Sequence, residues 1–429
     1  MSANQPPEKS MDIEHLGPAR FPSPLHRFIP NHSRIPLDIE GRSDRASENR
    51  VTFERAGARE RLYFDARQVR AGIVTCGGLC PGLNNVIRSV YMQLHHGYGV
   101  AEVLGFRCGY RGLDPERGSE PIRLTSDFVN DIHKHGGTVL GTSRGPVDTG
   151  VAVDYLARLG VNMLFCVGGD GTQRGALDLY EYARARGIEL AVVGIPKTID
   201  NDVAYVARTF GHQTAMEIAR TVIDAAHTEC KSVDYGISLV KLMGRHAGFI
   251  AAGATIASQD VNFTLIPESP FALNGPRGFL AALKSRMVQR RHAVIVVAEG
   301  AGQNLLPAEG DVDASGNRKL QDIGPFLCDR IAEYFKAEKL PVTLRYIDPS
   351  YIVRSHPADA EDAILCDLYA RNAVHAAMAG KTGVLIGFLH EAFIHVPIPA
   401  LRGHTRRVDP DGELWHAVVA ATGQPLRLE

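Results

Sequence analysis

The chain has 429 residues, 45% of them hydrophobic and 22% charged, and its formal net charge is −1. This composition indicates a globular protein large enough for two domains, and the near-zero charge excludes a general attraction to nucleic acid or membranes. No apolar run approaches the about 20 residues that span a bilayer, and residues 1–10 lack the pattern of a secretory signal. The seven cysteines are scattered and odd in number, which favours reduced, buried thiols over disulfides or a zinc site. A cytoplasmic protein with small-molecule partners is therefore expected.

Residues 1–68 are expected to form an N-terminal extension, because they are rich in proline, arginine and serine and show no sustained apolar period. Two interpretations stay open for this segment. It either drapes over the globular body or forms a mobile tail.

Residues 69–235 show short apolar strands alternating with helical patterns, which predicts a parallel sheet covered on both faces. The expected strands are RAGIVT (70–75), VAEVLGF (100–106), NMLFCV (162–167) and IELAVVGIPK (188–197), and the expected helices follow residue 82 and cover 151–160 and 172–187.

Residues 236–405 repeat this texture and are expected to form a second lobe, followed by a C-terminal segment at 406–429. The expected strands are GISLVKLMG, FTLIPE, HAVIVVAEGA, VTLRYID and GVLIGFL, and one helix is expected to be capped by Asn274 with Pro276 in its first turn. The fold class is therefore α/β, with two Rossmann-like lobes, mostly parallel sheets and an active-site cleft between them. Sites in such sheets lie beyond the carboxyl ends of the strands.

Two glycine-rich turns at strand ends have the character of phosphate-binding loops. In TCGGLCPGLNN, Gly77 and Gly78 would let the backbone approach an anion at a helix start, although many strand-to-helix turns contain glycine. In VGGDGT an acid lies among the glycines. A carboxylate beside a phosphate needs a cation between them, so Asp170 is interpreted as a magnesium ligand, with a helix-capping role as the alternative.

The segment GIPKTIDND carries Lys197, Thr198, Asp200 and Asp202 at the end of another strand. Phosphoryl transfer to an alcohol needs a carboxylate to accept the hydroxyl proton and cations to neutralise the transferring group. Asp200 is the candidate base, Asp202 its orienting or metal-linked partner and Lys197 a phosphate clamp. The alternative, an Asx-rich turn with a solvated lysine, explains all four residues together poorly.

Several arginines complete the candidate set. Arg144 and Arg245 lie among glycines, which suits a guanidinium aimed at phosphate oxygens, although each taken singly is more often a surface residue. Arg345 and Arg354, with Tyr351 between them, follow an expected strand and could hold a second phosphate that is bound rather than transferred.

Taken together, these strings resemble the 6-phosphofructokinase family. The matching pieces run in family order from about residue 70 to the C-terminus: GGLCPGLNNVIR, GGTVLGTSRG, GGDGTQ, PKTIDND, KLMGRHAGFIA, PESPF, VVAEGAGQ, YIDPSYIVRS and a closing RRVDPDGELWHAVVAATGQP.

The resemblance implies transfer of a phosphoryl group to the 1-hydroxyl of fructose 6-phosphate, a glycolytic step, in a homodimer or homotetramer. It implies that Asp200 is the base and that Asp170 holds Mg²⁺. The other implied catalytic positions are Lys197, Thr198, Asp202 and Arg245. The implied donor-binding positions are Gly78, Arg144, Asp170, Gly171, Thr172 and Lys197. The implied sugar-phosphate positions are Thr198, Asp200, Asp202, Met243, Gly244, Arg245, Glu268, Arg345, Tyr351 and Arg354.

Three departures from the bacterial pattern bear on the substrate and the donor. Tyr351 stands where bacterial members have a histidine, and no basic residue lies in register before MGR to reach a neighbouring subunit. Lys197 replaces a glycine, a pattern shared by pyrophosphate-dependent members and by plant and trypanosome ATP-dependent ones.

Gly171 decides between the donors in this interpretation. Pyrophosphate-dependent members carry aspartate there, and its carboxylate would repel the α-phosphate of a nucleotide. Glycine leaves that space open, so ATP is predicted as the donor, with pyrophosphate as the alternative. Two lesser alternatives are a kinase of the NAD or lipid type, which shares GGDGT, and a non-catalytic sugar-phosphate sensor.

Overall fold

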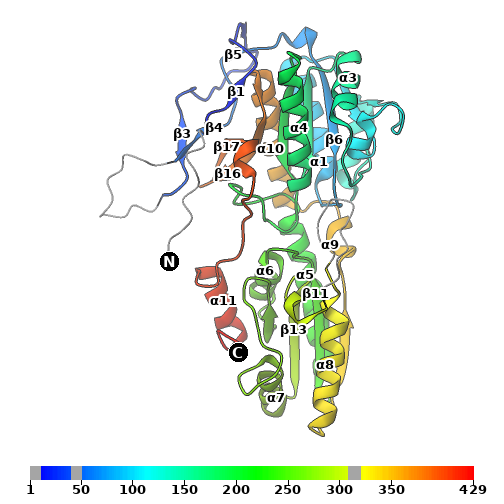
Figure 1. The fold of residues 1–429 in the computed structure, drawn as a ribbon, viewed down its shortest axis with the longest axis vertical. Coiled ribbons are helices and arrows are strands. Elements are labelled where there is room, and N and C mark those ends of the chain that lie inside the picture. Colours follow the sequence, from blue (N-terminus) through cyan, green and yellow to red (C-terminus); the bar gives the residue numbers. More distant parts are fainter. Residues whose placement is uncertain (1–10, 40–50, 308–319) are drawn as a thin grey trace. The chain divides into compact units, whose positions relative to one another are not determined.

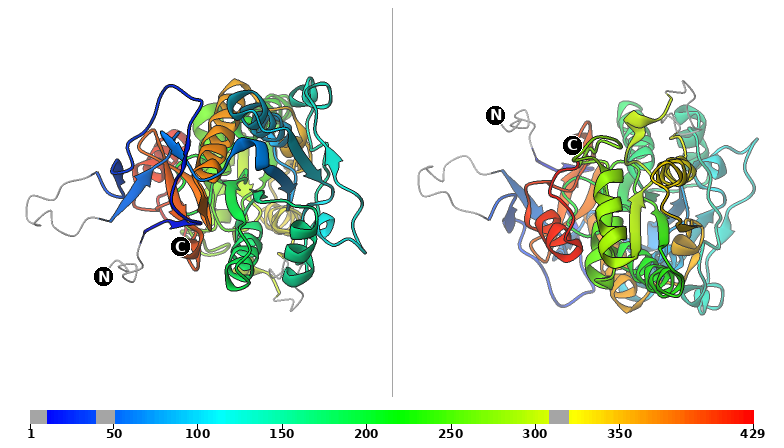
Figure 2. Two further views of the ribbon diagram at one scale, coloured as in Figure 1. Left: turned by 90° about the horizontal axis from the view of Figure 1, so that it is seen from above. Right: turned by 90° about the horizontal axis from the view of Figure 1, so that it is seen from below.

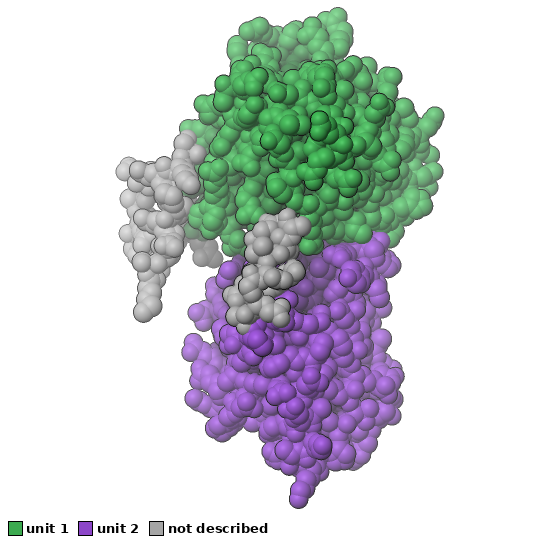
Figure 3. Space-filling model, turned by 45° about the vertical axis from the view of Figure 1, so that its right-hand side comes forward, with its two compact units in different colours: residues 1–198, 203–210, 357–405 green, residues 199–202, 211–356, 406–429 purple. Residues whose placement is uncertain are grey.

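The computed structural model describes residues 11–39, 51–307 and 320–429, which form two compact units (Figures 1 and 3). The first unit contains the described residues up to Thr198, with Val203–Phe210 and Pro357–Thr405. The second contains Ile199–Asp202, the described residues of Gly211–His356, and Arg406–Glu429. Both units are α/β structures, so the predicted fold class is confirmed. Within the described ranges, no helix has the length and apolar character that crossing a membrane requires.

The described part of the first unit is built on a nine-stranded mixed sheet. Its strand order is β3 (Arg34–Pro36), β4 (Thr52–Arg55), β17 (Ala392–Pro397), β16 (Val384–Leu389), β10 (Ala191–Pro196), β9 (Met163–Gly168), β6 (Arg70–Thr75), β7 (Glu102–Phe106) and β8 (Ile122–Arg123). The five strands from β16 to β7 run parallel and are almost fully buried, whereas β17, β4, β3 and β8 pair antiparallel at the two edges. Continuous Val, Ile and Leu runs are what a strand covered on both faces requires.

Helices cover both faces of this sheet (Figure 2, left view). On one face α3 (Thr149–Arg158) packs against α4 (Asp170–Ala185), which contacts β9 and β10. On the other face α1 (Leu83–Met92) packs against α10 (Ala360–Met378), which contacts β10 and β16. The shorter helical segments are α2 (Ser126–Val129), a π turn at Gln93–Gly97, and 3₁₀ turns at Ala66–Gln68, Gly109–Leu113, Ile132–Lys134 and Ile398–Leu401.

The described parts of the N-terminal extension add strands to this unit. β1 (Glu14–His15) pairs with β15 (Lys381–Thr382), β2 (Phe21–Pro22) pairs with β5 (Arg61–Leu62), and β4 pairs with β17. Of the two interpretations left open by the sequence, residues 11–39 and 51–68 follow the draped one. Residues 1–10 and 40–50 lie outside the described part.

The second unit is built on a parallel sheet, four-stranded in its described residues, of order β12 (Phe263–Leu265), β13 (His292–Ala298), β11 (Gly236–Leu242) and β14 (Thr343–Ile347). Helices α5 (His212–Lys231) and α6 (Phe249–Ser258) pack together on one face, and α7 (Phe279–Arg290) and α8 (Ile323–Ala337) pack together and contact β13, β11 and β14. The short α9 (Ile352–Ser355) contacts α5, α11 (Glu413–Thr422) contacts α6, and a 3₁₀ turn spans Gln303–Leu305.

The units change at 405/406, as expected, but not at 235, and residues 357–405 belong to the first unit and not to the second. Helix α5 belongs to the second unit because it packs on β11 and α6, and 357–405 belong to the first unit because β16 pairs with β10. The strand expected at GVLIGFL is therefore present but lies in the first sheet.

The predicted helix start at Asn274 is also wrong, because α7 begins after Gly278. Gly275 adopts φ +102°, and the chain reverses so that the Phe279 amide donates to the carbonyl of Ala272 at 2.9 Å.

Candidate active site

Three loops of the first unit leave the carboxyl ends of the adjacent parallel strands β6, β9 and β10. Because such ends share one edge of a sheet, their loops come together. The Lys197 amide donates to the carbonyl of Gly168 at 3.1 Å, which joins the loop after β10 to the loop after β9. The Gly77 amide donates to the carbonyl of Ser143 at 3.0 Å, which joins the loop after β6 to the segment carrying Arg144.

Lys197 connects the third of these loops to the first. Its side chain is 6% exposed, and its ammonium donates to the carbonyl of Gly78 at 2.7 Å. Gly77 has φ +86°, and a Cβ there would lie 3.3 Å from the Lys197 ammonium. Glycine at this position thus keeps both the left-handed backbone and the room for the cation. The predicted residues Gly78 and Lys197 are brought together, while the Arg144 side chain is exposed beside them.

The turn after β9 presents Asp170 as the first residue of α4, with its side chain exposed. A helix start carries unpaired N–H groups and a partial positive charge, which suits phosphate oxygens. Thr172 is buried, and its amide donates to the carbonyl of Gly169 at 2.9 Å, so it shapes the turn. Gly171 faces open space, because a Cβ there would meet no atom nearer than Nη2 of Arg174 at 3.8 Å.

The chemistry of this turn fits Mg²⁺. Among the described residues no group of three or more His, Cys, Asp or Glu side chains could hold a metal ion. Mg²⁺ commonly takes one or two protein carboxylates and completes its shell with substrate phosphates and water, so Asp170 alone suffices as its protein ligand. The neighbouring Cys76 is no competing ligand, because burial raises the pKa of its thiol to about 12.

The second unit carries the candidate base. In Ile199–Asp202 the side chains of Asp200 and Asp202 are half-buried, and Asn201 between them has φ +56°. The loop backbone is fixed from outside. His212 lies with Nδ1 2.7 Å from the carbonyl of Ile199, and the Arg406 amide donates to the carbonyl of Asp202 at 2.8 Å.

The loop after β11 carries Met243, Gly244 and Arg245. Gly244 has φ +131°, and a Cβ there would lie 2.7 Å from the carbonyl oxygen of Ala247. The Gly300 amide donates to the carbonyl of Gly244 at 3.1 Å, which joins this loop to the turn after β13. Parallel register between β11 and β13, with Leu242 opposite Ala298, creates this contact.

That contact places an acid the sequence did not single out, Glu299, close to Arg245. Burial raises the pKa of the Glu299 carboxyl, while the charges of Lys241 and Arg245 oppose the shift. Glu299 lies inside VVAEGAGQ, so the signal was present in a string used only for the resemblance.

Glu268 uses its carboxylate on backbone groups. Its Oε1 accepts from the amides of Gly248 at 3.0 Å and Val408 at 2.8 Å. These bonds tie the start of α6 to the C-terminal segment. Burial raises the pKa of Glu268 and those amides oppose the shift. Its predicted role in sugar binding stays a prediction.

The predicted phosphate-binding arginines have different surroundings. The guanidinium of Arg354 lies 5.1 Å from the centre of the Tyr351 ring, a cation–π geometry, and Tyr351 is 77% exposed. Arg345 instead pairs with Glu229 at 2.9 Å, near the end of α5 and toward the amino end of β11. The structure therefore joins Arg354 to Tyr351 but directs Arg345 elsewhere.

Lys241 is a second residue that sequence reasoning missed. Its ammonium contacts Asp322 at 3.0 Å and Asp348 at 2.9 Å, and its side chain is 11% exposed. Burial works to lower the pKa of Lys241, but its bonds to Asp348 and Asp322 raise it above the usual value. Asp348 begins the loop that leads to Tyr351 and Arg354, so Lys241 fixes the start of that loop.

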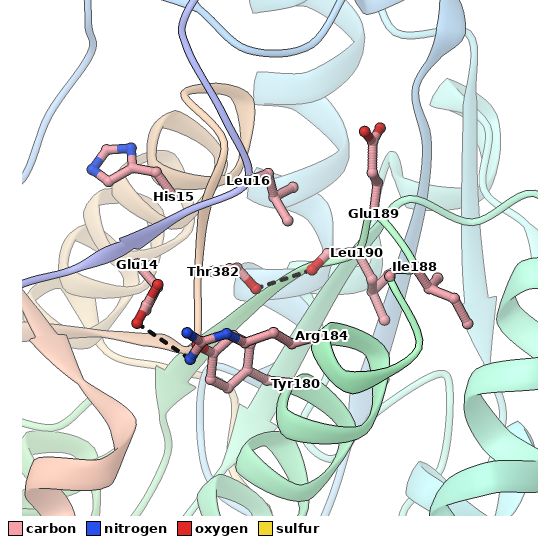
Figure 4. A pocket seen from close by; sticks show the side chains of 10 residues that line it. Glu14, His15, Leu16, Tyr180, Arg184, Ile188, Glu189, Leu190 and Thr382 are labelled. Carbon is pink, nitrogen blue, oxygen red and sulfur yellow. Dashed lines mark hydrogen bonds and ion pairs between the residues drawn. The ribbon is translucent and has the colours of Figure 1, made fainter.

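One pocket of the first unit, with a volume of about 290 Å³, lies away from these loops (Figure 4). Its lining includes Tyr180 and Arg184 in the last turns of α4 and Leu190 just before β10, whereas the candidate residues are at the opposite ends of both elements. Glu14 of the extension pairs with Arg184 at 3.3 Å across it.

Comparison with known proteins identifies the family to which the chain belongs. Residues 70–377 match the family model described as Phosphofructokinase. The chain is 45% identical to the ATP-dependent 6-phosphofructokinase of Borreliella burgdorferi, with 97% of each protein covered. It is 43% identical to the ATP-dependent 6-phosphofructokinase of Trypanosoma brucei brucei, with 99% of this chain and 90% of that protein covered.

Among solved structures, the pyrophosphate-dependent phosphofructokinase of Marinobacter aquaeolei superposes with a TM-score of 0.68 at 20% identity, covering 84% of this chain and 92% of that one. That likeness concerns the fold. The fold and its loops are those of a sugar-phosphate kinase scaffold, and the chain belongs to the phosphofructokinase family.

Proposed function

We propose that this chain transfers the terminal phosphoryl group of ATP to the 1-hydroxyl of fructose 6-phosphate, giving fructose 1,6-bisphosphate. The observation that carries the choice of donor is the open space at Gly171, next to Asp170 at the start of α4. Relatives that align over nearly the whole chain and are named ATP-dependent support the same donor. Transfer from pyrophosphate is the second candidate, and Lys197 is compatible with it.

On the donor side, the chain supplies fixed positive charge. The backbone N–H groups at the start of α4 face the donor phosphates, and the ammonium of Lys197, held on the carbonyl of Gly78, lies at the neighbouring loop. Asp170 would hold Mg²⁺, which when bound neutralises charge on the donor phosphates. Arg144, whose side chain is exposed, is assigned to the same phosphates.

On the acceptor side, Asp200 accepts the proton of the 1-hydroxyl as that oxygen forms its bond to the terminal phosphorus and the bond to ADP breaks. Asp202 and Thr198 flank the base in one continuous segment with Lys197. We assign Arg245 and Glu299 to the sugar hydroxyls, since the two charges lie close together, and Arg354 with Tyr351 to the 6-phosphate.

The testing experiment measures fructose 1,6-bisphosphate formation with ATP and with pyrophosphate in parallel, for the wild type and for Asp200→Asn. We expect activity with ATP, and a fall in kcat of several orders of magnitude for Asp200→Asn with fructose 6-phosphate binding retained. Activity mainly with pyrophosphate would reject the donor assignment. Near-normal turnover of Asp200→Asn would reject the assignment of Asp200 as base. If the wild type forms no product with either donor, a sugar-phosphate sensor would be favoured. A thermal shift with NAD but none with fructose 6-phosphate would favour the NAD-kinase alternative.

A homodimer or homotetramer and a cytoplasmic location remain predictions that accompany this function. Light scattering coupled to gel filtration tests the first.

A further inference from the structure

The loop that carries the candidate base is held by its backbone carbonyls. Nδ1 of His212 lies 2.7 Å from the carbonyl oxygen of Ile199, and since burial lowers the pKa of His212 to about 4, the neutral ring donates this bond. Two further bonds come from a single residue of the C-terminal segment. The amide of Arg406 donates to the carbonyl of Asp202 at 2.8 Å, and its Nη1 donates to the carbonyl of Asn201 at 3.3 Å.

These bonds matter because the loop has an uncommon backbone. Asn201 adopts φ +56°, in the left-handed region where residues other than glycine are disfavoured and asparagine is among the more tolerant. A conformation of this kind persists only when its surroundings fix it. Asp200 and Asp202 are the residues on either side of Asn201, so the directions of their side chains depend on its conformation.

Arg406 is itself well placed to fix the loop. Its guanidinium carbon lies 4.5 Å from the centre of the Phe249 ring, a stacked cation–π geometry. Phe249 is the first residue of α6 and follows the loop that carries Arg245. Arg406 therefore links the Asp200 loop to the start of α6. It lies beyond residues 70–377, which match the family model.

We propose that Arg406 is a positioning residue for the reaction, which holds the loop around Asn201 so that Asp200 meets the acceptor hydroxyl. This inference rests on the proposed role of Asp200 as base. It assigns Arg406 no contact with either substrate. A misplacement of about 1 Å in a catalytic group can reduce turnover roughly a hundredfold, so loss of this support is expected to appear in kcat.

The test is a double-mutant cycle on the full-length chain, with Arg406→Met and Asp200→Asn made singly and together. Alone, Arg406→Met is expected to lower kcat at least roughly tenfold and to change KM for ATP and for fructose 6-phosphate less than about threefold. In the Asp200→Asn background the same change is expected to alter kcat less than about twofold, because the group it positions is already gone. Arg406→Lys, which keeps the charge but not the planar fork, should restore activity in part. The control is Arg427→Met, an exposed arginine of the same segment that pairs with Glu429 at 3.9 Å and should behave as wild type.

Three results would overturn the inference. The first is that the fold-losses in kcat of the two single variants multiply in the double variant, since Arg406 would then act independently of Asp200. The second is that Arg406→Met raises both KM values and leaves kcat unchanged. The third is near-normal turnover of Asp200→Asn, which removes the base assignment as well and is recognised by that single variant alone. If Arg406→Met does not fold, Phe249→Leu removes only the stacking partner. It is then expected to lower kcat by roughly twofold to fivefold in the wild type and not in Asp200→Asn.

Discussion

Gly171 is the residue at which the donor can be tested most directly, because its backbone accepts a side chain. Its φ is not in the left-handed region, and a Cβ would meet only Nη2 of Arg174 at 3.8 Å. We expect Gly171→Asp to fold normally and to lower kcat/KM for ATP at least about a hundredfold, because the new carboxylate repels the α-phosphate. Activity with pyrophosphate should fall far less. Steady-state assays with both donors measure the difference, and equal losses would contradict the steric and electrostatic argument. Gly171→Ala, which adds only the Cβ, is the matched control.

The two half-buried glutamates of the second unit, Glu268 and Glu299, allow a second prediction at the same scale. Glu299→Gln is expected to raise KM for fructose 6-phosphate about tenfold, because a charged acceptor beside Arg245 is lost, and to leave the melting temperature nearly unchanged. Glu268→Gln is expected to do the reverse. It weakens the bonds to the amides of Gly248 and Val408 and should cost about 1–3 kcal/mol of stability. Thermal unfolding and substrate titration of both variants measure the predicted changes in melting temperature and in KM. A large rise in KM for fructose 6-phosphate with Glu268→Gln alone would support the predicted role of Glu268 in sugar binding.

Sequence reasoning found residues whose surroundings are local. Asp170 stands among glycines, and Lys197 and Asp200 lie together in PKTIDND, each segment at the end of a strand. A phosphate and a metal ion require such residues at such places, so the sequence was enough to identify them. Glu299 was missed because its neighbours Lys241 and Arg245 lie more than 50 positions away and meet it only through the register of β11 and β13. A single acidic residue after an apolar strand does not indicate which distant residues lie beside it.

At the scale of the elements, Lys241 fixes the loop between β14 and α9. Lys241→Met leaves Asp322 and Asp348 facing each other without a cation. Both carboxylates are partly exposed, so the cost in stability is expected to be modest, about 1–3 kcal/mol. The freed loop carries Tyr351 and Arg354, so KM for fructose 6-phosphate should rise severalfold while KM for ATP does not.

Chemical denaturation and substrate titration measure both effects of Lys241→Met. Lys241→Arg keeps the cation and should therefore retain most of the stability and of the affinity for fructose 6-phosphate. Lys284→Met is the control, since Lys284 makes an exposed ion pair with Glu338 at 2.6 Å in the same unit. Equal changes in the two KM values would argue against a role confined to the loop.

Whether a segment forms a strand or a helix was easier to predict than which sheet it joins. The strand expected at 70–75 is β6 with the same bounds, and the strands near 163–168, 191–196, 236–242 and 292–298 occur where apolar runs predicted them. The run at 383–389 was recognised as a strand but assigned to the second lobe, because a buried apolar run does not state which sheet it joins. The helix prediction failed at Gly275, because the sequence Asn274–Gly275–Pro276 suits either a helix start or a chain reversal.

At the scale of the whole molecule, three buried or half-buried histidines predict a loss of stability in mild acid. Burial lowers the pKa values of His212, His375 and His395 to about 4. In the unfolded chain the pKa of a histidine is about 6.5. Between these values the unfolded chain binds protons that the folded chain does not, so the free energy of unfolding falls as the pH falls, by about 1 kcal/mol per pH unit for each histidine.

Glu54 adds to this acid sensitivity. It pairs with Arg59 at 2.6 Å and with Lys381 at 2.7 Å, and His395 lies 3.4 Å away. Burial opposes ionisation, but His395 and Lys381 hold the pKa of Glu54 well below its usual value. Stability from Glu54 is thus present above its unfolded pKa and is lost below it. Urea unfolding at pH 5, 6 and 7 checks the histidine slope, with the exposed His416→Gln variant as control. A further measurement near pH 4 includes Glu54, whose contribution is lost only below its unfolded pKa of about 4.5. A flat profile would contradict the prediction.

The pairing of β4 with β17 has a consequence for how the chain is made. The first sheet contains β6, β7, β9 and β10 by residue 196, but β16 and β17 at 384–397 are needed to cover the edge of β10 and to receive β4. During synthesis that edge stays open while nearly 200 further residues, including most of the second unit, leave the ribosome. We expect nascent chains halted after residue 378 to be cleaved by protease within the first unit, and chains halted after the full sequence is exposed to resist. Strands β1 and β4 therefore gain their partners β15 and β17 only late in synthesis, whereas β2 and β3 pair with β5 and β4 much earlier.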